Sequence, residues 1–194
     1  MGQLVQTRGG AVALRVDAAP SQYLTFVLGG EMFAVGILNV KEIIEFGNLT
    51  EIPMMPAFIR GVINLRGSVV PVIDLAARFG GQSTEVSRRT CIVIVEVAEE
   101  DAGQVSRHDI GIMVDAVSEV LDIADSEIEP PPSFGARIRA DFIFGMGKVA
   151  GKFVIILNIN KVLSIEEIAR LTGTEAVVTE LHALAATAAT AATA

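Results

Sequence analysis

The chain has one cysteine, no tryptophan and two histidines in 194 residues. A lone thiol, Cys91, excludes an intrachain disulfide and is typical of a reducing compartment. His108 and His182 lie far apart in the sequence, and no set of histidine, cysteine and aspartate has metal-ligand or catalytic-triad spacing. We therefore expect no catalytic residue, no metal and no cofactor.

Long hydrophobic runs and positive charge are also scarce. Hydrophobic residues make up 51% of the chain, and the mean hydropathy is +0.53. Charged or turn-forming residues nevertheless interrupt every apolar run well short of the ~18 residues that a membrane-spanning helix needs. The formal net charge is −8, which opposes binding to nucleic acid or to an anionic membrane. We expect a cytoplasmic protein with no nucleic-acid partner and no direct membrane insertion.

The two ends of the chain differ in composition from its middle. Residues 1–21 mix glycine, alanine and polar residues without a period, which predicts a flexible arm. Residues 173–194 end in an Ala/Thr repeat, which predicts a disordered tail because threonine opposes the helix that alanine favours. Residues 22–172 form the predicted folded domain.

Within that domain the apolar residues mostly recur with a period of two. The stretches 22–28 and 31–37 alternate in this way and are joined by two glycines, which predicts a β-hairpin. Further short, buried strands are predicted at 91–97, 109–114 and 152–157. Short, numerous strands with few helices predict small barrels or a sandwich.

Capping signals predict two short helices. Asp74 opens DLAARF and Gly80 closes it, while Ser164 and Glu167 form a capping box that opens SIEEIARL. A third short helix with weaker caps is predicted over NVKEIIEF. Pro71 lacks a backbone donor, so its strand is expected at a sheet edge or at a bulge.

Two segments of the chain recur. GVINLRGSVVPVIDLAARF at 61–79 aligns with GMGKVAGKFVIILNINKVL at 145–163, so two glycines, a buried strand and a helix cap repeat. FAVGILNVKEI at 33–43 aligns with IGIMVDAVSEV at 110–120. These repeats predict an all-β fold with a few short helices, in which two small five-stranded SH3-like β-barrels meet across an apolar seam.

The motifs of the first predicted barrel span 31–80 and those of the second span 90–163. The repeat also isolates Arg66, because its counterpart in the second half is Ala150. A small neutral residue therefore suffices for this turn, whereas the planar guanidinium suits directed contacts to carboxylates and carbonyls in interfaces. A solvated arginine at a hairpin tip is the alternative interpretation.

LTEIPMMPAFIRGVINLRGSVVPVIDL, preceded by FAVGILNVKEI and followed by DAVSEVLDI and IEPPPSFG, resembles the CheW family of bacterial chemotaxis coupling proteins. The resemblance covers residues 22–172, although Ala76 stands where family members often have a basic residue. It implies two five-stranded barrels and a non-catalytic scaffold that joins transmembrane chemoreceptors to the histidine kinase CheA. The implied partners are the CheA regulatory domain and the cytoplasmic hairpin tip of methyl-accepting chemoreceptors, in arrays at the inner face of the membrane.

The resemblance also implies which residues bind partners. A first-barrel surface that contacts kinase and receptor is formed by Val40, Glu42, Ile43, Gly61, Arg66 and Gly67. A receptor-facing groove is lined by Val117 and Val120. Cys91 falls near the groove and is a weaker candidate, because its alternation with neighbouring valines favours a small core residue. For the three valines of the set, periodicity alone favours core packing in the seam between the barrels. The alternative interpretation of Glu42 is a solvated residue of a helix.

Two alternative functions are compatible with the same pattern. The chain could be a CheW-type coupling protein of a non-flagellar pathway, such as one that controls twitching or gliding motility. It could also be a small ligand-binding β-barrel. The large aliphatic residues on the inward faces of the predicted strands argue against the second alternative, because small barrels fill their interior with side chains.

Overall fold

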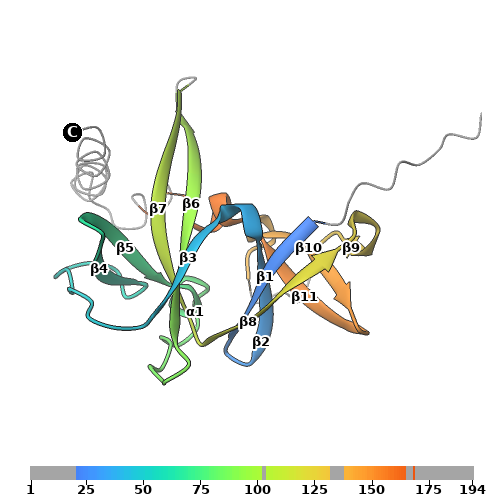
Figure 1. Ribbon diagram of the computed structural model, residues 1–194, viewed down its shortest axis with the longest axis horizontal. Helices are drawn as coiled ribbons and strands as arrows, with labels where there is room; N and C mark the ends of the chain where they lie inside the picture. The colour runs from blue at the N-terminus through green and yellow to red at the C-terminus, as the bar shows by residue number, and fades with distance from the viewer. Residues whose placement is uncertain (1–20, 102–103, 132–137, 165–167, 169–194) are drawn as a thin grey trace, which may run out of the picture.

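The computed structural model of the protein describes residues 21–101, 104–131, 138–164 and 168. Strands dominate it (Figure 1). They are β1 (Ser21–Leu28), β2 (Glu31–Gly36), β3 (Val40–Glu45), β4 (Ile59–Leu65), β5 (Ser68–Asp74), β6 (Cys91–Asp101), β7 (Gln104–Val114), β8 (Ala116–Ile123), β9 (Ile128–Glu129), β10 (Ile143–Val149) and β11 (Lys152–Leu157). The short helices are α1 (Leu75–Arg78), α2 (Ile159–Val162) and three 3₁₀ turns at Ile37–Asn39, Asp125–Glu127 and Ala140–Phe142.

The strands form two curled sheets that exchange elements. One sheet has five strands in the order β3-β6-β7-β5-β4, and the other has six in the order β8-β1-β2-β11-β10-β9. In Figure 1 the first lies on the left, around the upright β6–β7 hairpin, and the second lies toward the right. The sheet boundaries differ from the sequence ranges of the two sets of motifs, because β2 lies in the six-stranded sheet and β6 and β7 lie in the five-stranded sheet.

Both faces of the central strands are buried. Ile92 and Ile94 of β6 point into the interior of the first barrel, whereas the alternate residues Val93 and Val95 belong to a larger cluster shared by both sheets. A separate cluster around Ile156 fills the second barrel. The predicted apolar seam is thus the largest of three clusters, and the strands read as continuous apolar runs because each face has a core to fill.

The internal repeat holds residue by residue in the strand registers. Val72 of β5 pairs in parallel with Gly111 of β7, and their counterparts Ile156 and Ala34 pair in parallel in the other sheet. The cap repeats as well, because Asp74 accepts the N–H of Ala77 and Asn158 accepts that of Lys161. The predicted duplication and the two barrels are therefore confirmed.

The sixth strand of the second sheet is a minor variation on the same plan. β9 pairs with β10 at Met146, and the corresponding position in the first barrel, Val62, makes an isolated bridge with Thr50. A Cβ on Gly61 would lie 2.2 Å from the Thr50 carbonyl oxygen. Glycine is required at this point because the two backbones approach too closely for a side chain.

The third predicted helix is wrong, since residues 40–45 form strand β3, paired with β6 from Val40 to Glu45. The segment VKEIIE alternates half-buried and exposed residues with a period of two, and this pattern, with two β-branched isoleucines, prevailed over the helical propensity of lysine and glutamate. The DLAARF helix is confirmed as α1, with Gly80 in the left-handed region at φ +81°. Most of the SIEEIARL helix lies outside the described residues.

Pro71 is expected in an edge strand or at a bulge. Its strand is not an edge strand, but the β4–β5 register shifts between Ile59 and Gly61, next to the Pro71–Val62 pair. β5 is flanked by β4 on one side and β7 on the other. Its parallel pairing to β7 begins only at Val72, one residue after the proline. In the second barrel the corresponding Ile155 is paired with Phe33. The proline is accommodated because the ladder to β7 starts beyond it.

Candidate protein-binding surface

Strands β3 and β8 carry most of the residues that the sequence singled out. Ile43 pairs with Val93 and has 44% of its surface exposed, and its repeat counterpart Val120 pairs with Leu24 and is 46% exposed. These are matched positions on the two edge strands of the two sheets. Two aliphatic side chains at these levels of exposure are available for contact with another protein.

Val40 and Val117 are the second matched pair on the same two strands. Val40 pairs with Val95 and Val117 with Phe26, and both valines are half-buried against the seam cluster. They connect the surface to the core, so a polar substitution there acts on packing as well as on any partner contact.

The ion pair of Arg66 and Glu42 joins the β4–β5 turn to strand β3. The guanidinium Nη2 lies 3.0 Å from Glu42 Oε2, with 80% of the arginine side chain and 26% of the glutamate side chain exposed. Because β3 and β4 stand at opposite ends of the five-stranded order, this ion pair spans the closure of the first barrel. Its exposed guanidinium retains donors for a further carboxylate or carbonyl.

The two glycines of the set have backbone roles. Gly61 is buried where its backbone closely approaches Thr50. A partner protein cannot easily contact it directly at this position. Gly67 follows Arg66 in the β4–β5 turn, and both adopt positive φ, 52° for the arginine and 94° for the glycine. The Asn64 side chain accepts the Gly67 N–H at 2.8 Å and stabilises this turn.

Cys91 is half-buried at the start of β6 and packs against the seam cluster. Its Sγ donates to the Arg89 carbonyl at 3.2 Å. These contacts agree with the small core residue that the alternation along β6 indicated.

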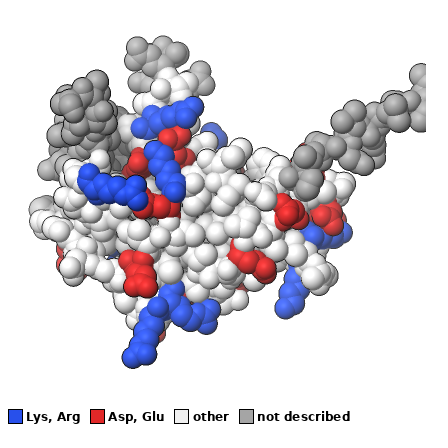
Figure 2. Space-filling view, in the orientation of Figure 1, with Lys and Arg blue, Asp and Glu red and all other residues white. Residues whose placement is uncertain are grey.

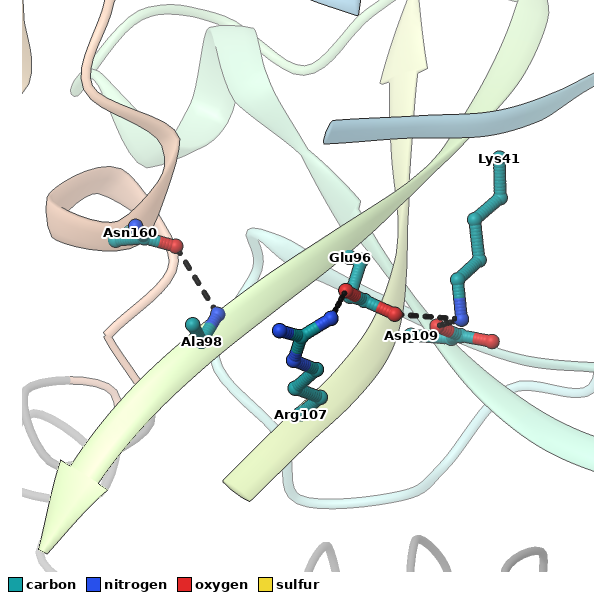
Figure 3. Close-up of polar contacts among 6 residues, drawn as sticks. All are labelled: Lys41, Glu96, Ala98, Arg107, Asp109 and Asn160. Atoms are coloured by element: carbon teal, nitrogen blue, oxygen red, sulfur yellow. Dashed lines mark hydrogen bonds and ion pairs between the residues drawn. The ribbon is translucent and has the colours of Figure 1, made fainter. Parts of the chain in front are cut away.

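A network of charges beside β3 was not identified from the sequence. Lys41 Nζ lies 3.0 Å from Glu96 Oε2 and 2.6 Å from Asp109 Oδ1, and Arg107 Nη1 lies 3.0 Å from Glu96 Oε1 (Figure 3). Glu96 and Asp109 stand directly opposite each other on β6 and β7. Two like charges in that position repel, so the lysine between them compensates for the repulsion. This arrangement depends on the pairing register of β6 and β7, which could not be predicted from the sequence.

The network shifts the ionisation of its members. Hydrogen bonding to Lys41 lowers the pKa of the Glu96 carboxyl, with a smaller opposing effect of desolvation. Hydrogen bonding to Asp109 raises the pKa of the Lys41 ammonium, again against desolvation. In the face shown in Figure 2, charged side chains gather over the region of β3, β6 and β7, while uncharged residues cover most of the centre. Lys41 and Arg107 are engaged in ion pairs within this network, whereas Ile43 on β3 is exposed and available for contact with another protein.

Two kinds of feature are absent from the described residues. No helix in the described ranges is long and apolar enough to cross a membrane. No group of three or more histidine, cysteine, aspartate or glutamate residues in the same ranges could hold a metal ion.

Two filled barrels with exposed aliphatic and ion-paired residues on their edge strands define a protein-binding module of the double-barrel type. Comparison with known proteins identifies the family. The model of the CheW-like domain matches residues 22–167. The chemotaxis protein CheW of Klebsiella aerogenes is 34% identical over 153 residues, covering 79% of this chain and 87% of that protein. Protein FrzA of Myxococcus xanthus is 30% identical over 154 residues, covering 78% and 91% respectively.

A solved structure agrees with this result. The scaffolding protein TtCheW from Thermoanaerobacter tengcongensis matches with a TM-score of 0.64 and 38% sequence identity, covering 74% of this chain and 92% of that one. The chain belongs to the CheW-like family, and it is a chemotaxis scaffold, or adaptor, protein.

Proposed function

We propose that the chain couples transmembrane chemoreceptors to CheA by binding the regulatory domain of the kinase and the cytoplasmic hairpin tip of the receptor. In this proposal it works in the cytoplasm, in receptor arrays at the inner face of the membrane, and catalyses no reaction. CheW proteins in general couple chemoreceptors and CheA, which supports the proposal through the family assignment. Packed aliphatic side chains inside both barrels disfavour the ligand-binding alternative.

The observation that carries the proposal is the exposed Arg66–Glu42 ion pair at the closure of the first barrel. An exposed ion pair contributes little to folding, typically about 0–1 kcal/mol. The second barrel also forms the same turn with Ala150, at φ 48°, which shows that the backbone needs no arginine there. The guanidinium is therefore available to act as a directed anchor for a partner.

Substitution of Arg66 tests this role directly. Arg66→Ala is expected to lower affinity for the regulatory domain or the receptor hairpin about thirtyfold, equivalent to ~2 kcal/mol, with less than about 1 kcal/mol change in stability. Arg66→Lys keeps the charge and loses the planar fork, so it is expected to weaken binding too. Titration calorimetry with each partner and urea unfolding of each variant supply the two readouts.

Arg107 provides a matched control for this experiment. Its side chain is 68% exposed and makes a single 3.0 Å ion pair, with Glu96, much as Arg66 does with Glu42. Arg107→Ala is expected to keep wild-type affinity for both partners. Equal behaviour of the two alanine variants would remove Arg66 from the interface.

The similarity to FrzA supports a second candidate pathway, in which the same adaptor serves twitching or gliding rather than flagellar motility. Deletion of the gene in the source organism, followed by swimming and surface-motility assays, distinguishes the two. Loss of directed swimming alone is the outcome expected from the main proposal.

A further inference from the structure

Arg78, the last residue of α1, links the first half of the chain to the second. Its Nε–H donates a hydrogen bond of 3.2 Å to the carbonyl of Val162, the last residue of α2. The two residues occupy the same position of the internal repeat, in DLAARF and NINKVL. The last carbonyls of a helix lack a partner within that helix, and here a guanidinium from the other half supplies one.

Two phenylalanines, one from each half, lie against the same guanidinium. The Cζ atom of Arg78 is 5.4 Å from the centroid of the Phe58 ring and 4.9 Å from that of the Phe142 ring. The two rings are equivalent, since the Phe58 carbonyl accepts the Asp74 N–H and the Phe142 carbonyl accepts the Asn158 N–H, both at 2.8 Å. A cation within about 6 Å of a ring centroid is attracted to the ring. Arg78 therefore binds one ring from each side of the seam.

These contacts lie at the border of the seam cluster. Phe142 and Val162 are buried members of the cluster, Phe58 packs against it, and Arg78 is half-buried. The hydrophobic effect that buries the cluster is not directional, so it changes little when the barrels turn slightly against each other. A planar guanidinium that contacts a carbonyl and two rings does depend on direction. The arginine therefore favours one angle between the barrels.

The repeat separates this role from a requirement of the helix. Val162 has the position of Arg78 in α2 and is fully buried, at 0% exposure. A helix of this kind therefore forms and packs with an aliphatic residue there. A second arginine in place of Val162 would bring two like charges together, and they would repel. One arginine, in contact with equivalent residues of both halves, is the arrangement that joins the barrels without this repulsion.

We propose that Arg78 is a latch between the two barrels, which holds them at one relative angle by binding both rings and the Val162 carbonyl. Its consequence for coupling rests on the proposed function. The first barrel carries Arg66, and β8 in the other sheet carries Val120. By fixing the angle between the two sheets, the latch fixes how the kinase and receptor surfaces are presented relative to each other.

Arg78→Val tests the latch in the full chain without a partner. The variant copies the residue of the second half, so it is expected to fold. Residual dipolar couplings of the ¹⁵N-labelled protein report the angle between the sheets. The strand amides of both sheets are expected to fit one alignment tensor in the wild type and two different tensors in the variant. A variant that keeps a single tensor and the wild-type angle would overturn the proposal.

A second variant keeps the test decisive if Arg78→Val does not fold. Phe58→Leu removes the ring of the first half from the same contact while keeping an apolar side chain at a half-buried position. It is expected to separate the two tensors as Arg78→Val does. Wild-type couplings in Phe58→Leu would show that the guanidinium does not hold the first barrel through this ring, which contradicts the latch.

Arg139 provides a matched control at the same ring. Its Cζ atom lies 4.6 Å from the Phe142 centroid, and its guanidinium forms an ion pair with Asp141, two residues away. Arg139→Val removes the same charge from the same ring but leaves the hydrogen bond to the Val162 carbonyl in place. It is expected to keep the wild-type couplings. Equal changes in the arginine variants would mean that charge at the ring sets the angle, and would overturn the latch.

Titrations with both partners separate the latch from the proposed function. Arg78→Val is expected to bind the CheA regulatory domain alone and the receptor hairpin alone as the wild type does. With the kinase domain already bound, its affinity for the receptor hairpin is expected to be about fivefold lower than that of the wild type. Equal affinities in that complex would overturn the consequence for coupling. Failure of the wild type to bind either partner would instead refute the proposed function, and the dipolar couplings would still decide the latch.

Discussion

The two barrels contain the same bulge on corresponding strands but stabilise it by different means. In the second barrel the buried Thr25 hydroxyl donates to the Glu119 carbonyl at 2.7 Å and accepts the Glu119 N–H at 3.2 Å. In the first barrel the position of Thr25 is taken by Ile94, and the bulge residue Lys41 forms ion pairs with Glu96 and Asp109. One bulge is held from the inside by hydrogen bonds, and the other from the outside by charges.

This difference shows which properties the repeat fixes and which it leaves open. Register, bulge and turn recur because they determine whether each sheet closes into a barrel. The side chains that stabilise the bulge and the turn differ between the barrels. The first barrel therefore has a charged flank and the exposed Arg66, whereas the second has Ala150 at the corresponding turn. The side-chain differences between the barrels are therefore where distinct partner contacts can arise.

The largest expected effect concerns the glycine that each barrel needs at its close approach. Gly61 has φ +139°, and a Cβ there would lie 2.2 Å from a backbone oxygen, whereas at Gly145 the nearest atom is a side-chain methyl of Ile128 at 2.5 Å. Gly61→Ala is expected to destabilise the protein by about 3 kcal/mol or more. Gly145→Ala is expected to cost less because the isoleucine can move. Urea unfolding followed by circular dichroism measures both, and equal losses would contradict the comparison.

Next in size is the internal hydrogen bond of the second bulge. Thr25→Val keeps the shape of the side chain but removes the hydroxyl that hydrogen-bonds to the Glu119 carbonyl and N–H. Both backbone groups are then left without a hydrogen-bond partner. The expected loss of stability is about 2 kcal/mol. Ser118→Ala, at an exposed neighbour in the same bulge, is the control and is expected to change stability by less than about 0.5 kcal/mol. A neutral Thr25→Val would mean that the bulge does not depend on the hydroxyl.

Much of this architecture could be predicted from the sequence because it rests on local patterns. The period of two, the paired glycines of the hairpin turn and the Asp74 cap each specify one element from adjacent residues. Alignment of 61–79 with 145–163 then related the two barrels without any knowledge of their contacts. The helix expected over 39–46 was wrong because β3 depends on pairing with β6, which is more than 45 residues away in the chain.

The candidate surface was predictable only in part for the same reason. Ile43 and Val120 follow from the motif, but their matching exposure depends on both strands being edges. The Arg66–Glu42 pair joins residues at opposite ends of a sheet order that the sequence does not specify. The Lys41 network depends on a register that places two acids face to face. Long-range pairing determines all three.

The matched exposed residues offer a third comparison, which follows from the proposed function. Ile43→Asp and Val120→Asp each place a carboxylate on an edge strand, and docking of a partner would have to desolvate it. Val120→Asp is expected to weaken receptor binding about tenfold and to leave kinase binding intact, whereas Ile43→Asp is expected to weaken both. Melting curves recorded with the titrations check that both variants fold. A loss of kinase binding in the Val120 variant would contradict the division of the surface.

The smallest expected effect is the pH dependence of the charged bulge. The pKa of Glu96 is lowered from its ordinary 4.5, so its contribution to stability is present above that value and is lost as pH falls through the lower folded value. The pKa of Lys41 is raised from 10.5, so its contribution is present below that value and is lost as pH rises through the higher folded value. The stabilisation is therefore expected to be complete only between about pH 5 and pH 10.

Lys41→Met tests this window. Because 44% of the lysine side chain is exposed, solvent screens the pairs, and the loss at neutral pH is expected to be about 0.5 kcal/mol. The difference between wild type and variant should shrink below pH 4 and at high salt, since acid protonates Glu96 and salt screens the charges. Thr25→Val has no titrating partner, so its cost should stay constant over the same range. A Lys41→Met difference that is equally constant would show that the lysine acts by packing its methylenes against β6, and that charge does not hold this bulge.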